Sequence, residues 1–175
     1  LYCKMLNEAV KHLKGEMEEE DYTTTIDLNI DAYIPDTYIS NEYQKLDIYK
    51  RIAAIESEEE MEDMVEELID RFGDIPKKVE MLLTVAQLKA LAHKVYVTAV
   101  EQKGDTYTFA MYERAKVCPE KIPALLKEFR DDLAFKAEPP TFIYRKKRIN
   151  KRDKTESALE VVKNVLIGIK GLLGN

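Results

Sequence analysis

Residues 57–73 carry the pattern that most constrains how this chain can fold. Ser57 and Glu60 form a capping box, in which each side chain binds a backbone N–H at the start of a helix. Gly73 can take the left-handed conformation that ends a helix. Between them, apolar residues recur at i, i+3, i+4, i+7, i+8 and i+11, and these are Met61, Met64, Val65, Leu68, Ile69 and Phe72. The chain therefore contains an amphipathic helix that must pack against other apolar surfaces.

Five further helices are predicted from apolar residues at helical spacing between capping or breaking residues. They cover residues 2–14, 40–55, 76–92, 123–132 and 155–172. Pro76 suits a first helical turn, where the N–H that proline lacks has no partner within the helix. In the helix capped by Ser40, the residues expected to face inward are Leu46, Tyr49, Ile52 and Ala53.

Alternation of apolar and polar residues predicts the strands. Residues 25–32 alternate until Pro35, which is typical of a strand with one wet face. Residues 95–102 and 106–112 are expected to form a hairpin that turns at Gly104-Asp105, and shorter strands are expected at 134–136 and 141–144. Together the elements predict a single compact α+β domain. In it, several helices pack on a small, largely antiparallel sheet, and both chain ends are helical extensions.

The charge balance and the cysteines narrow the class of protein. The net charge is −6, whereas a molecule that binds nucleic acid over its whole surface usually has a basic excess. Two lone thiols, Cys3 and Cys118, suggest a reducing compartment. No signal peptide is recognisable, and no apolar run approaches the ~20 residues of a membrane span. We expect a cytoplasmic protein without a membrane partner, and Leu1 within a helical pattern suggests a piece of a longer chain.

No residue set for catalysis stands out. The six glycines form neither of the phosphate-binding patterns G-x-x-x-x-G-K-[ST] and G-x-G-x-x-G. The possible nucleophiles and bases are isolated from one another and lack zinc-ligand spacing, and they are Cys3, Cys118, His12 and His93. We expect these side chains to be structural, and we expect no catalytic residue, metal or cofactor in this chain.

Four carboxylates fall on one ridge of the helix at 57–73, namely Asp63, Glu66, Glu67 and Asp70. Asp63–Glu67 and Glu66–Asp70 are like-charge pairs at i,i+4, each of which destabilises a helix by ~0.2–0.5 kcal/mol. Asp70 also lies in the last turn, where the carbonyl end of the helix disfavours an anion. The ridge is either a merely acidic surface or a face that binds positive charge on a partner. Two unfavourable features on one ridge make the second interpretation as good as the first.

A basic run after the last predicted strand is the alternative site. Its side chains could contact DNA phosphates without reading sequence. No aromatic stacking platform is interleaved with the run, and a solvated connector before the last helix explains the same residues. The candidate DNA-binding residues are Arg145, Lys146, Lys147, Arg148 and Arg152.

Three stretches of the chain resemble the C-terminal domain of the bacterial transcription-repair coupling factor. They read AYIPDTYI at 32–39, YKRIA at 49–53 and ELIDRFG at 67–73. The resemblance is specific over about residues 26–101. The opening residues look like the family's exit from the second helicase lobe, which implies a leading helix at 1–15 and the C-terminal domain at 16–175. One departure is Tyr96, where the family usually has glycine between a helix and the next strand.

The resemblance implies a regulatory interaction domain. Full-length proteins of this family are ATP-driven translocases on double-stranded DNA that displace stalled RNA polymerase and recruit UvrA, the damage-recognition ATPase of excision repair. Their C-terminal domain folds back on an N-terminal UvrB-like module and covers its UvrA-binding face, where acidic residues of the ELIDRFG helix meet basic residues. The matching positions here are Glu67 and Asp70. Asp63 and Glu66 join them from the ridge geometry alone.

Overall fold

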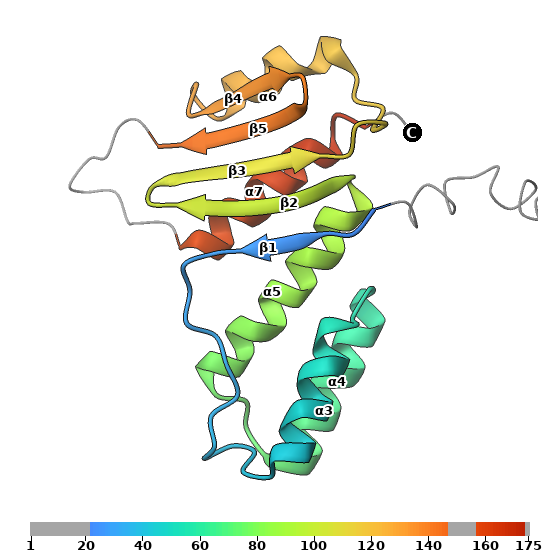
Figure 1. Ribbon diagram of the computed structural model, residues 1–175, viewed down its shortest axis with the longest axis vertical. Coiled ribbons are helices and arrows are strands. Elements are labelled where there is room, and N and C mark those ends of the chain that lie inside the picture. The colour runs from blue at the N-terminus through green and yellow to red at the C-terminus, as the bar shows by residue number, and fades with distance from the viewer. Residues whose placement is uncertain (1–21, 147–156, 174–175) are drawn as a thin grey trace, which may run out of the picture.

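One mixed sheet organises the fold (Figure 1). The computed structural model describes residues 22–146 and 157–173. Within them the strand order is β1-β2-β3-β5-β4, with β1 parallel to β2 and the other neighbours antiparallel. The largely antiparallel sheet predicted from the sequence is confirmed. The strands are β1 (Thr25–Asp27), β2 (Val97–Lys103), β3 (Thr106–Met111), β4 (Leu133–Ala137) and β5 (Pro140–Arg145).

Helices cover one side of the sheet and extend the molecule away from it. They are α3 (Glu42–Ala53), α4 (Glu58–Phe72), α5 (Lys77–Lys94), the 3-10 turn η1 (Pro119–Lys121), α6 (Ile122–Glu128) and α7 (Ala158–Lys170). Figure 1 shows α5 and α7 behind the same face of the sheet. It shows α3 and α4 beside the first half of α5, which extends away from the sheet. The α+β class is confirmed. Among the described helices, none is long and apolar enough to span a membrane.

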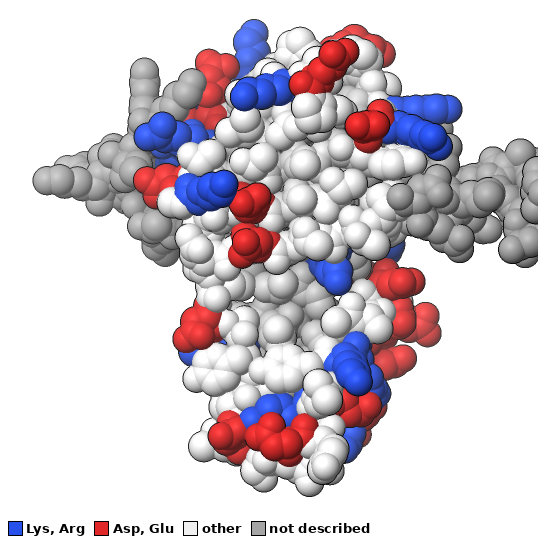
Figure 2. Space-filling model, viewed as in Figure 1, with Lys and Arg blue, Asp and Glu red and all other residues white. Residues whose placement is uncertain are grey.

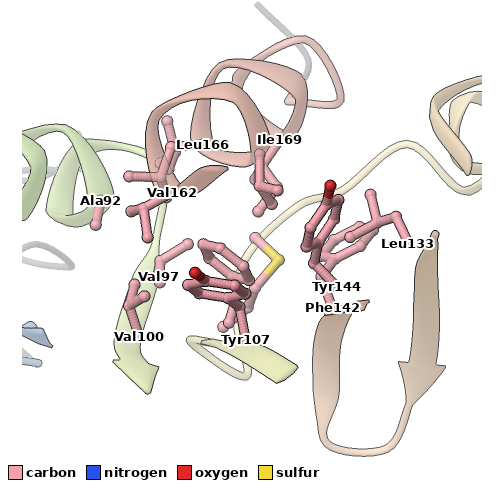
Figure 3. Packing of buried hydrophobic residues seen from close by; sticks show 14 of the residues in the cluster. Ala92, Val97, Val100, Tyr107, Leu133, Phe142, Tyr144, Val162, Leu166 and Ile169 are labelled. Carbon is pink, nitrogen blue, oxygen red and sulfur yellow. The ribbon is translucent and has the colours of Figure 1, made fainter. Parts of the chain in front are cut away.

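The larger hydrophobic core lies between the sheet and the helices α5 and α7. Every second residue of β3 is buried, as the two-residue period of a strand requires, and these are Tyr107, Phe109 and Met111. Figure 3 shows Val162, Leu166 and Ile169 of α7 directed toward this inner face. The C-terminal helix is therefore an integral part of the core.

A second hydrophobic core joins α3, α4 and the first half of α5. Val79 and Leu83 of α5 are buried here, whereas Leu88 and Ala92 of the same helix belong to the first core. At about 100° per residue, the two pairs lie on opposite sides of α5. One helix therefore connects two apolar clusters, which explains its broad apolar surface.

The ends of α4 follow the sequence pattern closely. The Oγ of Ser57 accepts the Glu60 N–H at 3.1 Å, and the Oε1 of Glu60 accepts the Glu56 N–H at 3.1 Å. Gly73 follows the helix with φ of +92°, the positive value that favours glycine. The buried residues of α4 are Met61, Met64 and Leu68. The capping box, the end and the inner face are confirmed, except that Ile69 is 46% exposed.

The start and the inner face of α3 differ from the prediction. Its N-cap is Asn41, whose Oδ1 accepts the N–H groups of Tyr43 and Gln44 at 2.9 and 3.0 Å. The cap is therefore not Ser40. The expectation that Leu46 and Ala53 face inward is also wrong, because the i,i+4 pair Ile48 and Ile52 occupies the buried stripe. A helix this short buries one stripe, and Leu46 lies on nearly the opposite side from Ile48.

The strand expected at 25–32 is paired only over its first residues. β1 pairs with Ala99–Glu101 and ends at Asp27. Beyond it, the Asn29 N–H donates to the side-chain Oε1 of Gln102 at 2.9 Å. This residue therefore no longer pairs with β2 through backbone hydrogen bonds. An alternating pattern predicts which side chains face inward but not how many residues find a strand partner.

The turn between α5 and β2 uses a left-handed residue, and Tyr96 adopts that conformation with φ of +63°. A side chain there costs roughly 1 kcal/mol relative to glycine. The carbonyl of Tyr96 accepts the Tyr112 N–H at 2.7 Å, and its ring centroid lies 6.1 Å from that of Tyr22. These contacts hold the residue in place although it is not a glycine.

The second half of the chain follows the predicted order. The first hairpin turns at Gly104, which has φ of +60°. The pair Pro139-Pro140 lies at the turn of the β4–β5 hairpin, where Ala137 is opposite Pro140. α7 begins after the N-cap Ser157. The helix predicted at 2–14 lies outside the described residues.

Candidate protein-docking site

The acidic ridge lies on α4, in a helical hairpin with α3. The connection between the two helices is short, so they run in opposite directions (Figure 1). The buried stripe of α4 leaves the ridge on another side of the helix. Asp63, Glu66 and Asp70 are exposed there, and Glu67 is half-buried. The fold therefore presents the carboxylates predicted from the sequence on one surface.

Glu67 is already neutralised by arginines of its own chain. Arg51 of α3 binds it with two hydrogen bonds, from Nη1 to Oε2 at 2.6 Å and from Nη2 to Oε1 at 2.5 Å. Arg71 adds a third, from Nη1 to Oε2 at 2.8 Å. Hydrogen bonds from Arg51 and then Arg71 lower the pKa of Glu67 to about 2. Of the four carboxylates predicted as candidates to bind a partner's positive charge, Glu67 is therefore already paired within the domain.

The sequence predicts the contact of Glu67 with one of these arginines but not with the other. Arg71 lies at i+4 from Glu67, the spacing at which a helix relieves a carboxylate, and this signal was present in the pattern. Arg51 is 16 residues away on another helix. Only the packing of α3 against α4 brings it to Glu67.

The other three carboxylates of the ridge have no ion-pair partner within residues 22–146 and 157–173. Glu66 and Asp70 remain a like-charge pair at i,i+4. Asp70 keeps its unfavourable place in the last turn of α4. No ion pair to Glu66 or Asp70 within the described part of the domain offsets these costs.

A hollow of about 290 Å³ opens beside the ridge and is lined by Arg51, Ala54, Ile55, Glu60, Asp63 and Met64. The carboxylate of Glu60 is occupied by the capping contacts with Glu56 and Ser57. Asp63 therefore supplies the unpaired carboxylate of the hollow, next to apolar side chains and to Arg51, which is itself paired with Glu67. A long basic side chain suits such a place, because its methylene groups can contact the apolar side chains while its charge meets the carboxylate.

Negative charge is concentrated in this hairpin. Residues 42–72 carry eleven acidic and four basic side chains, a net charge of −7, while the whole chain carries −6. The rest of the chain is therefore close to neutral. Figure 2 shows acidic side chains at the bottom and along the right edge of the lower half, around α3 and α4, and an uncharged centre over the sheet. Such a local field attracts a positively charged surface.

The alternative basic site is described only at its start. Arg145 is the exposed last residue of β5, and its N–H donates to the Asp132 carbonyl at 2.8 Å. Lys146 follows and is half-buried. Lys147, Arg148 and Arg152 lie outside the described residues.

Two of the possible nucleophiles and bases, His93 and Cys118, lie within the described residues, and both make contacts within the fold. The hydroxyl of Thr24 donates to the Val97 carbonyl at 2.8 Å and lies 3.0 Å from Nδ1 of His93. The Tyr22 hydroxyl donates to the His93 carbonyl. Cys118 is half-buried, with its N–H on the Leu172 carbonyl at 3.0 Å. Cys3 and His12 lie outside the described residues.

The family follows from comparison with known proteins. A family model described as the TRCF domain matches residues 28–122, which include the whole α3–α4 hairpin. This chain belongs to the TRCF domain family. The resemblance to transcription-repair coupling factor predicted from the sequence is thereby confirmed.

Relatives of this TRCF domain are much longer proteins. It is 36% identical over 175 residues to the transcription-repair-coupling factor of Bacillus subtilis (strain 168), covering 98% of this chain and 14% of that protein. It is 41% identical over 117 residues to that of Staphylococcus haemolyticus (strain JCSC1435), covering 66% of this chain and 10% of that protein. The TRCF domain therefore spans only a small part of these relatives.

The fold of this TRCF domain also matches a solved structure. A crystal structure of the C-terminal domain of transcription-repair coupling factor has a TM-score of 0.68 and 28% sequence identity to it. The match covers 86% of this chain and 92% of that one. The arrangement of helices and sheet is thus that of a domain at the C-terminus of such a factor.

Proposed function

We propose that this TRCF domain is a regulatory docking domain that binds, through the α3–α4 hairpin, to the N-terminal UvrB-like module of its parent protein. In doing so it covers the UvrA-binding face of that module. The observation that carries the proposal is the net charge of −7 within residues 42–72, together with the exposed carboxylates of Asp63, Glu66 and Asp70. A complementary basic face would offset the repulsion among these groups and steer the two surfaces together.

Glu67 takes a supporting part in this proposal. Its carboxylate is shared between Arg51 and Arg71, so it links α3 to α4 and fixes the ridge in one orientation. Asp63, Glu66 and Asp70 are the groups that meet the partner. The hollow beside Asp63 receives one basic side chain.

The energies suit a reversible latch. An exposed ion pair contributes ~0.2–1 kcal/mol, so a few pairs bias a closed state by ~1–3 kcal/mol, the range of typical allosteric coupling. A competing partner can therefore open the contact. Salt weakens it, because exposed charges are screened over about 8–10 Å at physiological ionic strength.

The names of the relatives suggest the setting of this latch, since they are transcription-repair-coupling factors. We infer a cytoplasmic parent protein that uses ATP to translocate on double-stranded DNA, displaces stalled RNA polymerase and recruits UvrA for nucleotide excision repair. This domain contributes binding and not a catalytic step. It needs no cofactor of its own.

The proposal is tested by Asp70→Lys in the full-length parent protein. Asp70 is exposed, unpaired within the described residues and in the last turn of α4, where lysine is favourable. The variant should fold normally and bind UvrA at least about fivefold more tightly, because the closed state loses ~1 kcal/mol or more. UvrA affinity is measured by biolayer interferometry at low salt, and folding by circular dichroism.

A matched control is Glu128→Lys, an exposed acidic residue in the last turn of α6. It changes the total charge equally but lies outside the hairpin, so UvrA affinity should stay unchanged. The proposal fails if Asp70→Lys folds and leaves UvrA binding as it was. It also fails if Glu128→Lys raises UvrA binding by the same factor.

A further inference from the structure

The first turns of α3 present an apolar patch to solvent. Tyr43 is 86% exposed, more than any other large hydrophobic residue in the described part of the chain, and Leu46 is 53% exposed. The side chain of Tyr43 makes no hydrogen bond or ring contact within the described residues. Since Ile48 and Ile52 form the buried stripe of this helix, both residues lie on its outward side. An exposed tyrosine ring of this kind is typical of a binding surface.

The patch continues into the acidic surface. Tyr43, Asp47 and Arg51 are spaced i, i+4, i+8 and share one ridge of α3. Nη1 of Arg51 lies 4.0 Å from Oδ2 of Asp47, and the same arginine binds Glu67 of α4. The α3 ridge therefore borders the acidic ridge of α4. Because the helices run in opposite directions, Tyr43 lies at the same end of the hairpin as Asp70 (Figure 1).

Three carboxylates near Tyr43 are open to solvent, while Lys50 and Arg51 lie about two turns farther along α3. The side chains of Asp36, Glu42 and Asp47 are 80%, 82% and 63% exposed. Lys45 is only 13% exposed and is bound by Asp36 and Glu42. The N-terminus of α3 disfavours a cation, but the C-terminus of α4 lies at the same end and opposes that dipole. The surroundings of the ring are therefore suited to positive charge.

We propose that Tyr43 and Asp47 form a binding site for an arginine side chain of a protein partner, with Leu46 contacting its apolar neighbours. Residues at i and i+4 have Cβ atoms roughly 6 Å apart, so one guanidinium can lie over the ring while it pairs with the carboxylate. Arginine suits both contacts because it is planar, stacks on aromatic rings and donates paired hydrogen bonds. The proposal rests on the docking function above and extends the docking surface from α4 to α3.

The site is tested with the 175-residue chain and two peptides, hexa-arginine and hexa-lysine, by calorimetry at low salt. The chain should bind hexa-arginine more tightly than hexa-lysine. Tyr43→Ala should weaken hexa-arginine binding about threefold and remove the difference between the peptides, as expected for the loss of one exposed cation–π contact. Tyr43→Phe keeps the ring and should keep the preference. Ile167→Ala, at a 50% exposed position on α7, is the matched control and should change neither affinity.

The outcomes separate this inference from the docking function. If Tyr43→Ala leaves the affinity for hexa-arginine unchanged, the proposal of an arginine site is wrong, even if Asp70→Lys increases the affinity for UvrA. If Tyr43→Ala removes the preference for arginine but Asp70→Lys has no effect in the full-length protein, the site stands and its partner is not the UvrB-like module. If Tyr43→Phe loses the preference as well, the hydroxyl rather than the ring face binds, and the cation–π proposal is wrong.

Discussion

A carboxylate on a helix behaves differently when an arginine of its own chain reaches it, and α4 contains both cases. Glu67 shares its two oxygens between Arg51 and Arg71. Glu66, the preceding residue, is exposed and has no ion pair in the described residues. Paired hydrogen bonds from a guanidinium are among the stronger polar contacts in proteins. Of two neighbouring glutamates, Glu67 is thus paired within the domain, whereas Glu66 is left open to solvent, as the proposed docking surface requires.

This difference predicts opposite results for two glutamine substitutions. Glu67→Gln should lower the free energy of unfolding by about 1 kcal/mol at pH 7, because both arginines lose their charged partner. Glu66→Gln should have little effect or a slight stabilising one, since it removes repulsion with Asp70. Urea unfolding of both variants measures the free energies. An equal loss in the two variants would contradict the role given to Glu67.

The stability difference between the wild-type chain and Glu67→Gln should also depend on pH. The pKa of Glu67 is lowered from 4.5 to about 2 in the folded domain, so the folded state prefers the charged carboxylate. Its contribution is therefore complete above about pH 4.5 and is lost as the pH falls toward 2. The stability gap between the wild-type chain and Glu67→Gln should narrow over that range. A gap of constant size from pH 7 to pH 3 would show that the ion pairs are not its source.

At the scale of the elements, the start of α3 shows how a helix boundary is decided. Ser40 and Asn41 are adjacent and both suit an N-cap, but only Asn41 accepts backbone N–H groups. Asn41→Ala should therefore lower the free energy of unfolding by about 1 kcal/mol, and Ser40→Ala by a few tenths at most. Ser57→Ala serves as the reference variant, because it removes the N-cap hydrogen bond of α4 from the Glu60 N–H to the Ser57 Oγ. Thermal and urea unfolding compare the three, and a larger loss for Ser40→Ala would reverse the assignment.

The elements also show which parts of the fold and site are readable from the sequence. The bounds of α4 are predictable because Ser57 with Glu60 at its start, and Gly73 at its end, each act on the backbone within a few residues. The inner face of α3 is not, because Leu46 and Ile48 are equally apolar and only packing against α5 selects between them. The pairing of Glu67 with Arg51 depends on the contact between two helices. Local signals thus placed the carboxylates, while tertiary contacts decided which of them are free.

At the scale of the molecule, two hydrophobic clusters share one helix. The sheet, α6, α7 and the second half of α5 form one, and α3, α4 and the first half of α5 form the other. The charged hairpin thus stands apart from the sheet, on its own smaller core (Figure 1). Under the proposed docking function, the hairpin can then be covered and uncovered without disturbing the sheet. The smaller cluster should also be the less stable of the two, because it buries fewer residues.

This arrangement predicts separate local unfolding of the hairpin. Leu68 is fully buried in the smaller core, and Leu68→Ala should cost about 2–5 kcal/mol there. Hydrogen exchange followed by mass spectrometry should show faster exchange in α3, α4 and the first half of α5, while β2, β3 and β5 keep their protection. Val162→Ala in α7 is the reciprocal variant and should affect the sheet first. Uniformly faster exchange over the whole chain in Leu68→Ala would mean that α5 couples the two cores into one cooperative unit.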